Sequence, residues 1–458
     1  MRLTVIGTGY LGAVHAACMA EIGHDVLGID VDARRIKALA EGRAPFFEPG
    51  LDEVLARNVA SGRLRFTTCL REAAGFSELH FVCVGTPQHG DSPAADLSHV
   101  DAVIDGLALH LRQDALVVGK STVPVGTAER LTARLAAHVP TGIKAEVAWN
   151  PEFLRQGLAV HDTLRPDRLV AGVTTARADA VLRAVYAPML TAGVPYISTD
   201  PATAELVKMA ANSFLATKIS FINAMAEVCD TVGADVVTLA DAIGHDPRIG
   251  RRFLSAGLGF GGGCLPKDLR AFAARAQELG VDHAVSFLRQ VDEINLHQRW
   301  RTVTAARDLV GGDLVGHRIA VLGATFKPDS DDVRDSPSLT VAAELHRQGA
   351  EVRVHDPQGI ENARTALPGP HYEDEVSEAC RDADAVLHLT EWSEYRSLDP
   401  DALAALVHTP ALLDARNSLD TGRWVSAGWN VRALGRPATA PYPDFRKPSV
   451  TTPRTWQP

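Results

Sequence analysis

Short apolar runs alternate with amphipathic stretches along residues 1–199. The apolar runs have the length of buried strands, and the stretches between them repeat their apolar positions with the period of a helix. This alternation predicts a parallel sheet with crossover helices. The strands are expected at Leu3–Ile6, Asp25–Ile29, Leu79–Val84, Leu116–Gly119 and Ala145–Ala148.

The pattern changes to almost continuous helix over residues 200–310. Thr203–Val232 contains few helix breakers and keeps an apolar face, and a second long helix is expected over 284–310. We interpret the first of these helices as a rigid connector and an oligomer interface.

The strand and helix pattern returns over residues 311–436. Its first elements are, in order, strand Arg318–Leu322, Gly323, helix Ser338–Gly349, strand Glu351–His355 and Asp356. The predicted fold is therefore α/β: two Rossmann-like, doubly wound parallel-sheet domains joined by a central helical domain with a long connecting helix. The last segment, 437–458, is rich in Pro, Thr and Arg, and we expect it to be a disordered tail.

Composition narrows the class of partner. The formal net charge is -10 and no block of Lys or Arg reverses it locally, which argues against a nucleic-acid partner. The six cysteines show no CxxC pairing, so reduced thiols and a cytoplasmic location are expected. No apolar run reaches the length of a membrane span, and the N-terminal residues form a strand rather than a signal peptide.

The first strand runs directly into Gly7-Thr8-Gly9-Tyr10-Leu11-Gly12, and Asp30 ends the next strand. In this context GxGxxG predicts a dinucleotide site, because each glycine has a separate task. Gly7 makes the tight turn, Gly9 lets a pyrophosphate approach the backbone, and Gly12 lets the helix pack on the strand. Asp30 should bind the adenosine ribose and repel a 2′-phosphate, which favours NAD. Arg34 and Arg35 keep NADP open, and another nucleotide or none is the alternative.

Two further loops follow strand ends, at Gly85-Thr86-Pro87 and at Ser121-Thr122-Val123-Pro124. Ligands of open α/β sheets lie against the carboxyl ends of the strands, so both loops should line the cofactor or the substrate. Ordinary turn formation is the alternative for each.

A cysteine with the surroundings of a nucleophile lies in Gly259-Phe-Gly-Gly-Gly-Cys264-Leu-Pro-Lys267-Asp268. Pro266 suits the first turn of a helix, so Cys264 should lie in the field of a helix N-terminus and beside Lys267, which favours thiolate. The glycines would let a substrate approach closely. The alternative is a buried cysteine after a flexible loop.

Three more residues complete a possible chemistry. Lys208 and Asn212 share a helix face among apolar neighbours, so Lys208 either extends to solvent or is held inside. Glu152 follows a strand end, where it could also cap a turn. A thiol combined with NAD suggests oxidation of an alcohol to an acid through a thiohemiacetal and a thioester. Lys208 and Asn212 would then meet the oxyanion, and Glu152 or Asp268 would activate water.

The turn after the first strand of the third region, 323–337, has no GxGxxG, so a second dinucleotide is not expected. It offers Lys327, Arg334 and a helix start at Ser336-Pro337 instead, which suit a smaller phosphate-bearing ligand. A solvated surface loop is the alternative.

Taken together, these motifs resemble the UDP-glucose/GDP-mannose dehydrogenase family. The resemblance covers about residues 1–436. Its motifs are G-T-G-Y-L-G at 7–12, E-P-G-L at 48–51, G-T-P at 85–87, S-T-V-P at 121–124, N-P-E-F-L-R at 150–155, L-V-K-M-A-A-N-S-F-L-A-T-K-I-S-F-I-N at 206–223, G-F-G-G-G-C-L-P-K-D at 259–268 and F-K-P-D-S-D-D-V-R at 326–334. The helix and the cysteine loop resemble the UDP-glucose branch more than the N-acetyl-hexosamine branches.

The resemblance implies the oxidation of UDP-glucose to UDP-glucuronate with two NAD. By similarity, the catalytic residues are Cys264, Lys208, Asn212, Asp268, Glu152 and Thr122. The cofactor residues are Gly7, Gly9, Tyr10, Leu11, Gly12, Asp30, Arg35, Thr86, Thr122, Gln156 and Arg334. The substrate residues are Glu152, Phe153, Leu154, Arg155, Lys208, Asn212, Phe253, Leu254, Gly257, Gly261, Lys327 and Arg416, with Arg248 supplied by a neighbouring subunit of a homodimer or larger homo-oligomer. No metal is implied.

Two positions depart from the family. The family usually has Glu where this chain has Gln156, and a neutral amide cannot take a proton, so thioester hydrolysis could rest on Glu152 alone. The D-G-R-N motif is Asp414-Ala415-Arg416-Asn417 here, and Ala415 cannot adopt a positive φ cheaply. The alternatives are the same chemistry on GDP-mannose or another nucleotide sugar, and a catalytically weak regulator that binds NAD and a nucleotide sugar.

Overall fold

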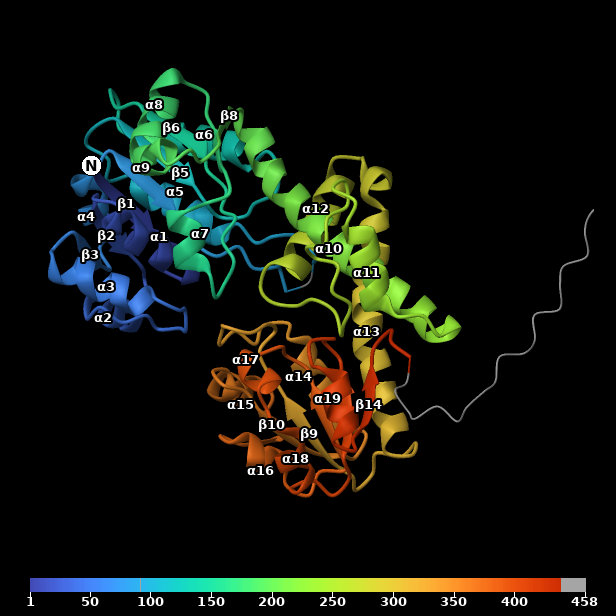
Figure 1. Cartoon of the computed structure of the whole chain (residues 1–458). Helices are drawn as coiled ribbons and strands as arrows, with labels where there is room; N and C mark the ends of the chain where they lie inside the picture. The colour runs from blue at the N-terminus through green and yellow to red at the C-terminus, as the bar shows by residue number, and fades with distance from the viewer. Residues whose placement is uncertain (91, 438–458) are drawn as a thin grey trace, which may run out of the picture.

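The computed structural model describes residues 1–90 and 92–437, so the tail expected at 437–458 lies, apart from residue 437, outside the described residues. Two α/β parts lie at opposite ends of a group of long helices (Figure 1). The predicted fold class is confirmed, because each α/β part is built on a sheet of mainly parallel strands. We call the two α/β parts the N-terminal and C-terminal domains, and the group of helices between them the central domain.

The sheet of the N-terminal domain has the order β3-β2-β1-β4-β5-β6-β7-β8. Its strands are β1 (Arg2–Ile6), β2 (Asp25–Ile29), β3 (Leu64–Thr67), β4 (Leu79–Val82), β5 (Ala115–Gly119), β6 (Ala145–Trp149), β7 (Leu169–Gly172) and β8 (Tyr196–Thr199). The five predicted strands are present, although the one that was expected to end at Val84 stops at Val82. Three short strands, β3, β7 and β8, were missed, and β6 meets β7 in an antiparallel pair, Trp149 with Gly172, against the expectation of a parallel sheet.

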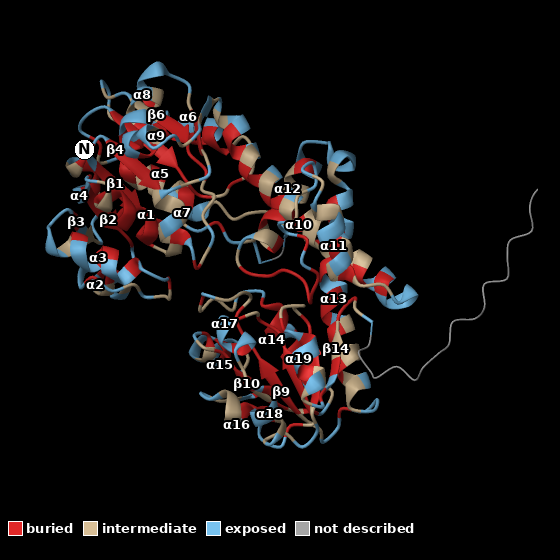
Figure 2. Ribbon diagram, in the orientation of Figure 1, coloured by how far each residue is buried: buried red, intermediate tan, exposed pale blue. Residues whose placement is uncertain are grey.

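Helices cover both faces of this sheet (Figure 1). They are α1 (Tyr10–Glu21), α2 (Ala33–Ala40), α3 (Leu51–Ala60), α4 (Leu70–Phe76), α5 (Ser98–Ala108), α6 (Thr127–His138), α7 (Ala159–Leu164), α8 (Ala176–Val185) and α9 (Ala187–Thr191). One core contains most of α1, and the other lies under α5 and α6. The central strands are accordingly buried, while the edge strands β3 and β8 and the outer helix faces are partly or fully exposed (Figure 2).

The central domain is helical. Its elements are α10 (Pro201–Val232), α11 (Val236–Gly244), α12 (Leu265–Glu278), a short 3-10 helix η1 (Asp282–Val285) and α13 (Phe287–Leu309). Local sequence explains the bounds of α10. The Asp200 carboxylate accepts a hydrogen bond from the Thr203 amide at 2.8 Å, Pro201 occupies the first turn, and Gly233 ends the helix at φ 73°.

The C-terminal domain has a second sheet with the order β11-β10-β9-β12-β13-β14, and all its pairs are parallel. Its strands are β9 (Arg318–Leu322), β10 (Glu351–His355), β11 (His371–Tyr372), β12 (Ala385–His388), β13 (Ala411–Asp414) and β14 (Asn430–Ala433). Its helices are α14 (Pro337–Arg347), α15 (Ile360–Ala366), α16 (Val376–Cys380), α17 (Ser393–Arg396), α18 (Pro400–Ala404) and α19 (Thr421–Ser426). Two apolar cores, one on each face, hold it together.

Candidate functional site

The cysteine loop connects all three domains. Cys264 is the N-cap residue of α12, as the position of Pro266 predicts. The loop before it packs so closely on the C-terminal domain that a Cβ on Gly261 would lie 2.2 Å from the Asp335 carbonyl oxygen. A Cβ on Gly263 would lie 2.6 Å from the Arg334 guanidinium carbon. Glycine is therefore required here by contact between segments, and it leaves the Cys264 side chain accessible.

Polar groups from three elements lie around this thiol. On α12, Asp268 is 1% exposed, and it accepts hydrogen bonds from the Asn212 amide at 2.7 Å and from the Lys267 ammonium at 2.8 Å. On α10, the Lys208 ammonium forms an ion pair with the Glu152 carboxylate at 2.9 Å. The structure thus assembles α10, α12 and the turn after β6 into one charged cluster.

The expectation of a thiolate at Cys264 is not supported by these surroundings. The thiol can be reached by solvent, yet protein surrounds it on most sides, and this burial raises its pKa. The carboxylates of Glu152 and Asp268 raise the pKa further, and the ammonium groups of Lys208 and Lys267 only partly oppose them. The reason is that Lys267 pairs with Asp268 rather than with the thiol. Cys264 is therefore a protonated thiol, which would need a base in order to act as a nucleophile.

Lys208 does not extend to solvent. Its side chain is 7% exposed and its ammonium faces Glu152. Burial alone would lower its pKa, but the negative charges of Glu152 and Asp268 and the hydrogen bond to Glu152 outweigh burial and raise it. Lys208 is therefore a permanently charged ammonium held inside the cluster, which decides between the two alternatives that its sequence neighbours left open.

The glycine turn has the geometry that a dinucleotide needs. Gly7 has φ 88°, and a Cβ on Gly12 would lie 1.8 Å from the Gly7 carbonyl oxygen. A Cβ on Gly9, in contrast, would meet no atom within 4 Å, so open space lies where the pyrophosphate is expected. Tyr10 and Leu11 open α1 directly after it, with the Tyr10 hydroxyl donating to Glu48. These residues fit NAD.

Asp30 lies at the end of β2, as expected, and is 7% exposed. Its carboxylate accepts the Thr8 amide at 2.8 Å and forms an ion pair with Arg35 at 2.9 Å. The Arg35 guanidinium is therefore held beside the ribose position. The other predicted cofactor loops meet as well, because the Thr86 hydroxyl donates to the Thr122 carbonyl oxygen at 2.7 Å.

The loop 324–336 of the C-terminal domain reaches across to the N-terminal domain. The Lys327 ammonium donates to the Gln156 carbonyl oxygen. The Gln156 amide nitrogen donates to Asp332 at 3.0 Å, and Asp332 also pairs with Arg334. Burial lowers the pKa of Lys327, while the negative charge of Glu48 partly opposes this change. Gln156, Lys327 and Arg334 are thus brought to one place, and the loop is not the solvated surface loop of the alternative.

The remaining predicted substrate residues fall into two groups. Phe153 and Leu154 follow Glu152, and the Leu154 amide donates to the Glu152 carboxylate at 2.9 Å. Arg155 pairs with Asp162 at 2.7 Å. The second group lies where the cysteine loop meets the C-terminal domain, and comprises Phe253, Leu254, Gly257, Gly261 and Arg416.

Arg416 joins segments of this junction. Its guanidinium donates to the carbonyl oxygens of Leu389 at 2.8 Å, Gly259 at 3.0 Å and Phe326 at 3.3 Å. The concern about Ala415 is not realised, since Asn417, at φ 53°, is the residue of this motif with positive φ. Ala415 instead offers its carbonyl oxygen to the Leu258 amide at 2.9 Å.

Arg248 is not brought to the cluster. It follows α11, its side chain is 87% exposed, and its guanidinium pairs with Asp246 at 2.6 Å.

Two residues with a clear place at the site were missed. Glu48, whose E-P-G-L motif was noticed without a role, accepts the Gly157 and Ala159 amides at 2.6 Å each and so fixes the start of α7. Lys120 is buried after β5, and its place in a strand-end loop was a signal that could have been used.

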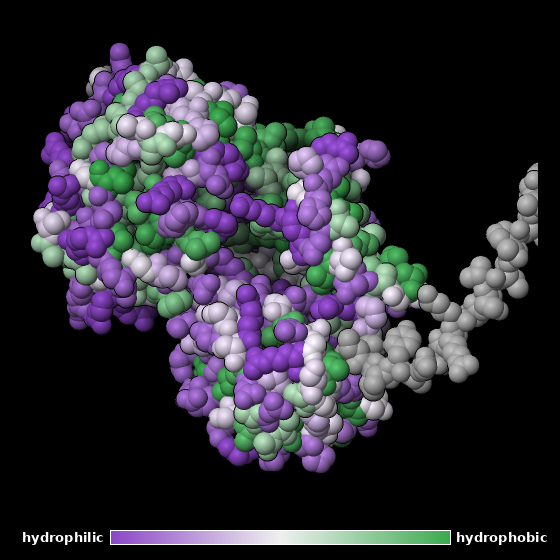
Figure 3. All heavy atoms as spheres, in the orientation of Figure 1, coloured by the Kyte–Doolittle hydropathy of each residue, from purple (hydrophilic) through white to green (hydrophobic). Residues whose placement is uncertain are grey.

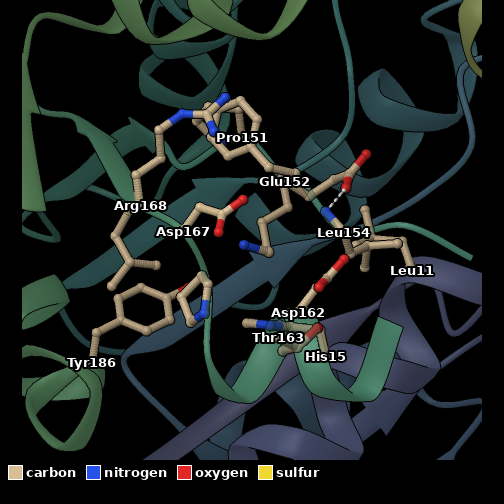
Figure 4. A pocket seen from close by; sticks show the side chains of 14 residues that line it. Leu11, His15, Pro151, Glu152, Leu154, Asp162, Thr163, Asp167, Arg168 and Tyr186 are labelled. Carbon is tan, nitrogen blue, oxygen red and sulfur yellow. Dashed lines mark hydrogen bonds between the residues drawn. The ribbon is translucent and has the colours of Figure 1, made fainter. Parts of the chain in front are cut away.

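A pocket lies next to Glu152 on the α1 side of the sheet (Figure 4). Its walls come from α1, from the turns after β5 and β6, and from the segment 162–169. The surface is also hollowed between the N-terminal domain and the rest of the molecule (Figure 3). Glu152 therefore belongs both to the charged cluster and to the lining of this pocket.

Three family models match the chain in the order of its domains. They describe the NAD binding domain (residues 1–190), the central domain (202–297) and the UDP binding domain (320–421) of the UDP-glucose/GDP-mannose dehydrogenase family. The chain belongs to the UDP-glucose/GDP-mannose dehydrogenase family. It is an NAD-dependent nucleotide-sugar dehydrogenase, which confirms the predicted family, cofactor and enzyme class.

Relatives and solved structures agree with this membership. A UDP-glucose 6-dehydrogenase of Rhizobium meliloti is 44% identical over 95% of this chain and 100% of its own length. One of Bacillus subtilis is 39% identical over 96% and 99%. The structure of a UDP-glucose dehydrogenase from Pyrobaculum islandicum has a TM-score of 0.86 at 39% identity, covering 92% of this chain and 95% of that one. Among the described residues of this dehydrogenase, no helix is long and apolar enough to cross a membrane.

Proposed function

We propose that this dehydrogenase oxidises UDP-glucose to UDP-glucuronate through a thiohemiacetal and a thioester on Cys264. The observation that carries the proposal is the accessible Cys264 thiol at the start of α12, within a cluster that holds Lys208, Asn212, Asp268 and Glu152. Relatives at about this distance are named for UDP-glucose. NAD supplies the hydride acceptor when it is bound.

The cluster supports a division of tasks. Glu152 takes the proton of the sugar hydroxyl and later that of the attacking water, because its carboxylate faces the cluster. The Cys264 sulfur adds to the aldehyde carbon, and the thiol proton passes to a base of the cluster, since burial keeps the free thiol protonated. The ammonium of Lys208 and the amide of Asn212 stabilise the oxyanion.

Hydrolysis of the thioester releases the acid and regenerates the thiol. We assign the placement of water to Asp268 and Thr122. Gln156 donates a hydrogen bond to Asp332 and carries no carboxylate, so the proton of this water goes to Glu152.

Cofactor and substrate residues complete the proposal. The pyrophosphate binds at the start of α1, against Gly7, Gly9 and Gly12. The ribose binds to Asp30 and Arg35. The remainder of the cofactor contacts Thr86, Thr122, Gln156 and Arg334. The nucleotide sugar lies between the turn Glu152–Arg155 and the junction that Arg416 organises, with Phe253, Leu254, Gly257, Gly261 and Lys327 around it.

We also propose a homo-oligomer that works in the cytoplasm. Along α10 an exposed apolar stripe runs through Leu206, Phe214, Phe221, Val228 and Val232, of which Phe214 is 66% exposed. A second copy would cover this stripe and bring Arg248 to the substrate. All six cysteines are free thiols, which suits a reducing compartment.

The test is the number of NADH released per nucleotide sugar, followed by absorbance with UDP-glucose and GDP-mannose offered separately. Two NADH per UDP-glucose are expected, and none from Cys264→Ala with NAD binding preserved. Cys69→Ala, which removes an exposed thiol, is the matched control and should keep full turnover. Turnover with GDP-mannose alone would change the substrate assignment. A burst of two NADH per site that then stalls would mean that thioester hydrolysis fails with Gln156.

A further inference from the structure

Lys120 is a buried charge that the proposed chemistry leaves without a task. It follows β5 and is 7% exposed. Its ammonium donates to the Asn150 side-chain oxygen at 2.9 Å and lies 6.0 Å from the ring centre of Tyr186. Among residues 1–90 and 92–437, no carboxylate forms an ion pair with it. A buried lysine without a carboxylate partner is costly to keep.

Asn150 links Lys120 to the turn that carries Glu152. The Asn150 side-chain oxygen accepts both the Lys120 ammonium and the Tyr186 hydroxyl, the latter at 2.6 Å. Its side-chain nitrogen donates to the Val170 carbonyl oxygen at 2.7 Å. Glu152 lies two residues further along the chain. The ammonium therefore holds one end of the turn that presents Glu152.

Lys120 and Glu152 also line the same pocket, together with His15 and Tyr186 (Figure 4). Both ring nitrogens of His15 are without a partner among the described residues, and His15 is 1% exposed. Polar groups on several walls make this a space suited to water. Lys120 and Glu152 therefore share one polar pocket, which the carboxylates of Asp162 and Asp167 also line.

The titratable groups around Lys120 come from four elements. Burial lowers the pKa of Lys120 to about 8, and the charge of Lys208 on α10 acts in the same direction. Cys83 after β4 and Glu152 after β6 oppose this change. On α1, burial first and then the Lys120 charge keep the pKa of His15 well below its ordinary value, so His15 stays neutral. With a pKa of about 8, Lys120 can change its charge in the mildly alkaline range, as a proton partner must.

We propose that Lys120 is a positioning residue for Glu152 and accepts its proton through the pocket behind it. The inference rests on the proposed function, in which Glu152 takes the proton of the hydrolytic water. The carboxylic acid of Glu152 then passes this proton through pocket water to the neutral Lys120 amine. Glu152 returns to a carboxylate, Lys120 becomes an ammonium, and the ammonium releases the proton to solvent. Substrate and cofactor can cover the cluster meanwhile without trapping the proton.

The kinetic test separates the two hydride transfers from the hydrolysis that follows them. We expect Lys120→Met to leave the single-turnover formation of two NADH per site almost unchanged and to slow steady-state turnover roughly ten- to a hundredfold above pH 8. Lys120→Arg keeps a cation beside Asn150, so the KM for the substrate should be retained. Its guanidinium cannot lose a proton, so steady-state turnover above pH 8 should fall as it does in Lys120→Met. Lys144→Met, at the exposed residue that precedes β6, is the matched control and should behave as wild type.

An unchanged pH profile in Lys120→Met would overturn the proposal. An equal slowing of hydride transfer and of hydrolysis, together with a lower thermal midpoint, would also overturn it, because that result describes a structural role. The proton partnership can also be tested without turnover, by NMR titration of 13C-labelled lysines in the full chain. One lysine should titrate near pH 8 and shift in Glu152→Gln, and titration of every lysine above pH 10 would overturn the proposal. If the wild-type protein does not reduce NAD with UDP-glucose, the proposed function is wrong. The lysine titration would still show whether Lys120 is coupled to Glu152.

Discussion

The two α/β domains share their first six strand positions but differ in the turn that follows the first strand. Counted within each domain, both sheets have the order 3-2-1-4-5-6, and the N-terminal sheet adds β7 and β8 at one edge. In both, a glycine with positive φ ends the first strand, Gly7 at 88° and Gly323 at 111°. Each glycine amide donates to the last carbonyl of the second strand, Ile29 at 2.7 Å and His355 at 2.8 Å.

The aspartate after the second strand has different partners in the two domains. Asp30 keeps only short local contacts with Thr8, Asp32 and Arg35. Asp356, 2% exposed, accepts five hydrogen bonds from the surrounding loops, in addition to one from the Trp392 indole. Its carboxylate holds the domain together and has no capacity left for a ribose.

The helix start differs as well. In the N-terminal domain α1 begins at Tyr10, so its free amides lie beside the strand end. In the C-terminal domain α14 begins only at Pro337, after the loop that crosses to Gln156. The same topology therefore leaves an open helix start in one domain, where we propose that the pyrophosphate binds, and makes an interdomain connection in the other.

The strongest test of this contrast is Gly12→Ala. A methyl group 1.8 Å from the Gly7 carbonyl oxygen cannot be accommodated without moving α1 off β1. We expect the N-terminal domain to lose about 3 kcal/mol of stability or more, as strong overpacking does. Hydrogen exchange should show loss of protection in β1 and α1 while β9 and β10 keep theirs. Equal loss in both sheets would mean that the domains do not unfold separately.

A second test replaces the aspartate that follows the second strand by asparagine, in each domain separately. Asp356→Asn places an NH2 group against backbone donors and should cost about 1.5–3 kcal/mol of stability, with NAD affinity unchanged. Asp30→Asn should instead leave the thermal midpoint almost unchanged and weaken the preference for NAD over NADP. Calorimetry and cofactor titration read the two effects, and a loss of NAD binding in Asp356→Asn would contradict the assignment.

Gly9→Ala should act on binding alone. Its Cβ meets nothing within 4 Å in the protein, and Gly9 has φ −64°, so folding should be unaffected. The methyl group would occupy the place of the pyrophosphate, and we expect NAD binding to weaken roughly tenfold, about 1.4 kcal/mol. Fluorescence titration with NADH measures it, and Gly75→Ala, also free of contacts, is the control. Unchanged affinity would mean that the pyrophosphate does not bind next to Gly9.

A further test uses a pH dependence that separates the domains. Burial raises the pKa of Glu205, which caps α6, to about 7 from 4.5, and the Ala128 and Gly126 amides only partly oppose it. The folded state then binds more protons than the unfolded state between these values, so stability falls as pH rises.

In the C-terminal domain the opposite sign holds for Asp414. Burial would raise its pKa, but the hydrogen bond and charge of His388 lower it below 3.8, so its stabilisation is lost only in stronger acid. Between pH 5 and 7.5 we expect protection of β5 and β6 to fall and that of β12 and β13 to stay constant. Glu205→Gln should flatten the first change, and an unaltered slope in that variant would assign it to another group.

Much of the architecture could be predicted from the sequence because it depends on local patterns. The strands at Arg318–Leu322 and Glu351–His355 match those expected, since buried parallel strands are continuous apolar runs between glycine and aspartate. β7 and β8 were missed because Leu169–Gly172 and Tyr196–Thr199 are short and the second is largely exposed. Only their pairing with each other identifies them as strands.

The sequence by itself determined which chemistry this dehydrogenase carries: the glycine turn, Asp30, and Cys264 at a helix start are each set by neighbouring residues. The tertiary structure decided the charge state and the connections of those groups. Lys267 pairs with Asp268 and leaves Cys264 a thiol, Lys208 is held inside by Glu152, and Lys120 is buried behind that carboxylate. The physical reason is that burial and pairing depend on segments far apart in the chain, whereas helix starts and turns depend on a few adjacent residues.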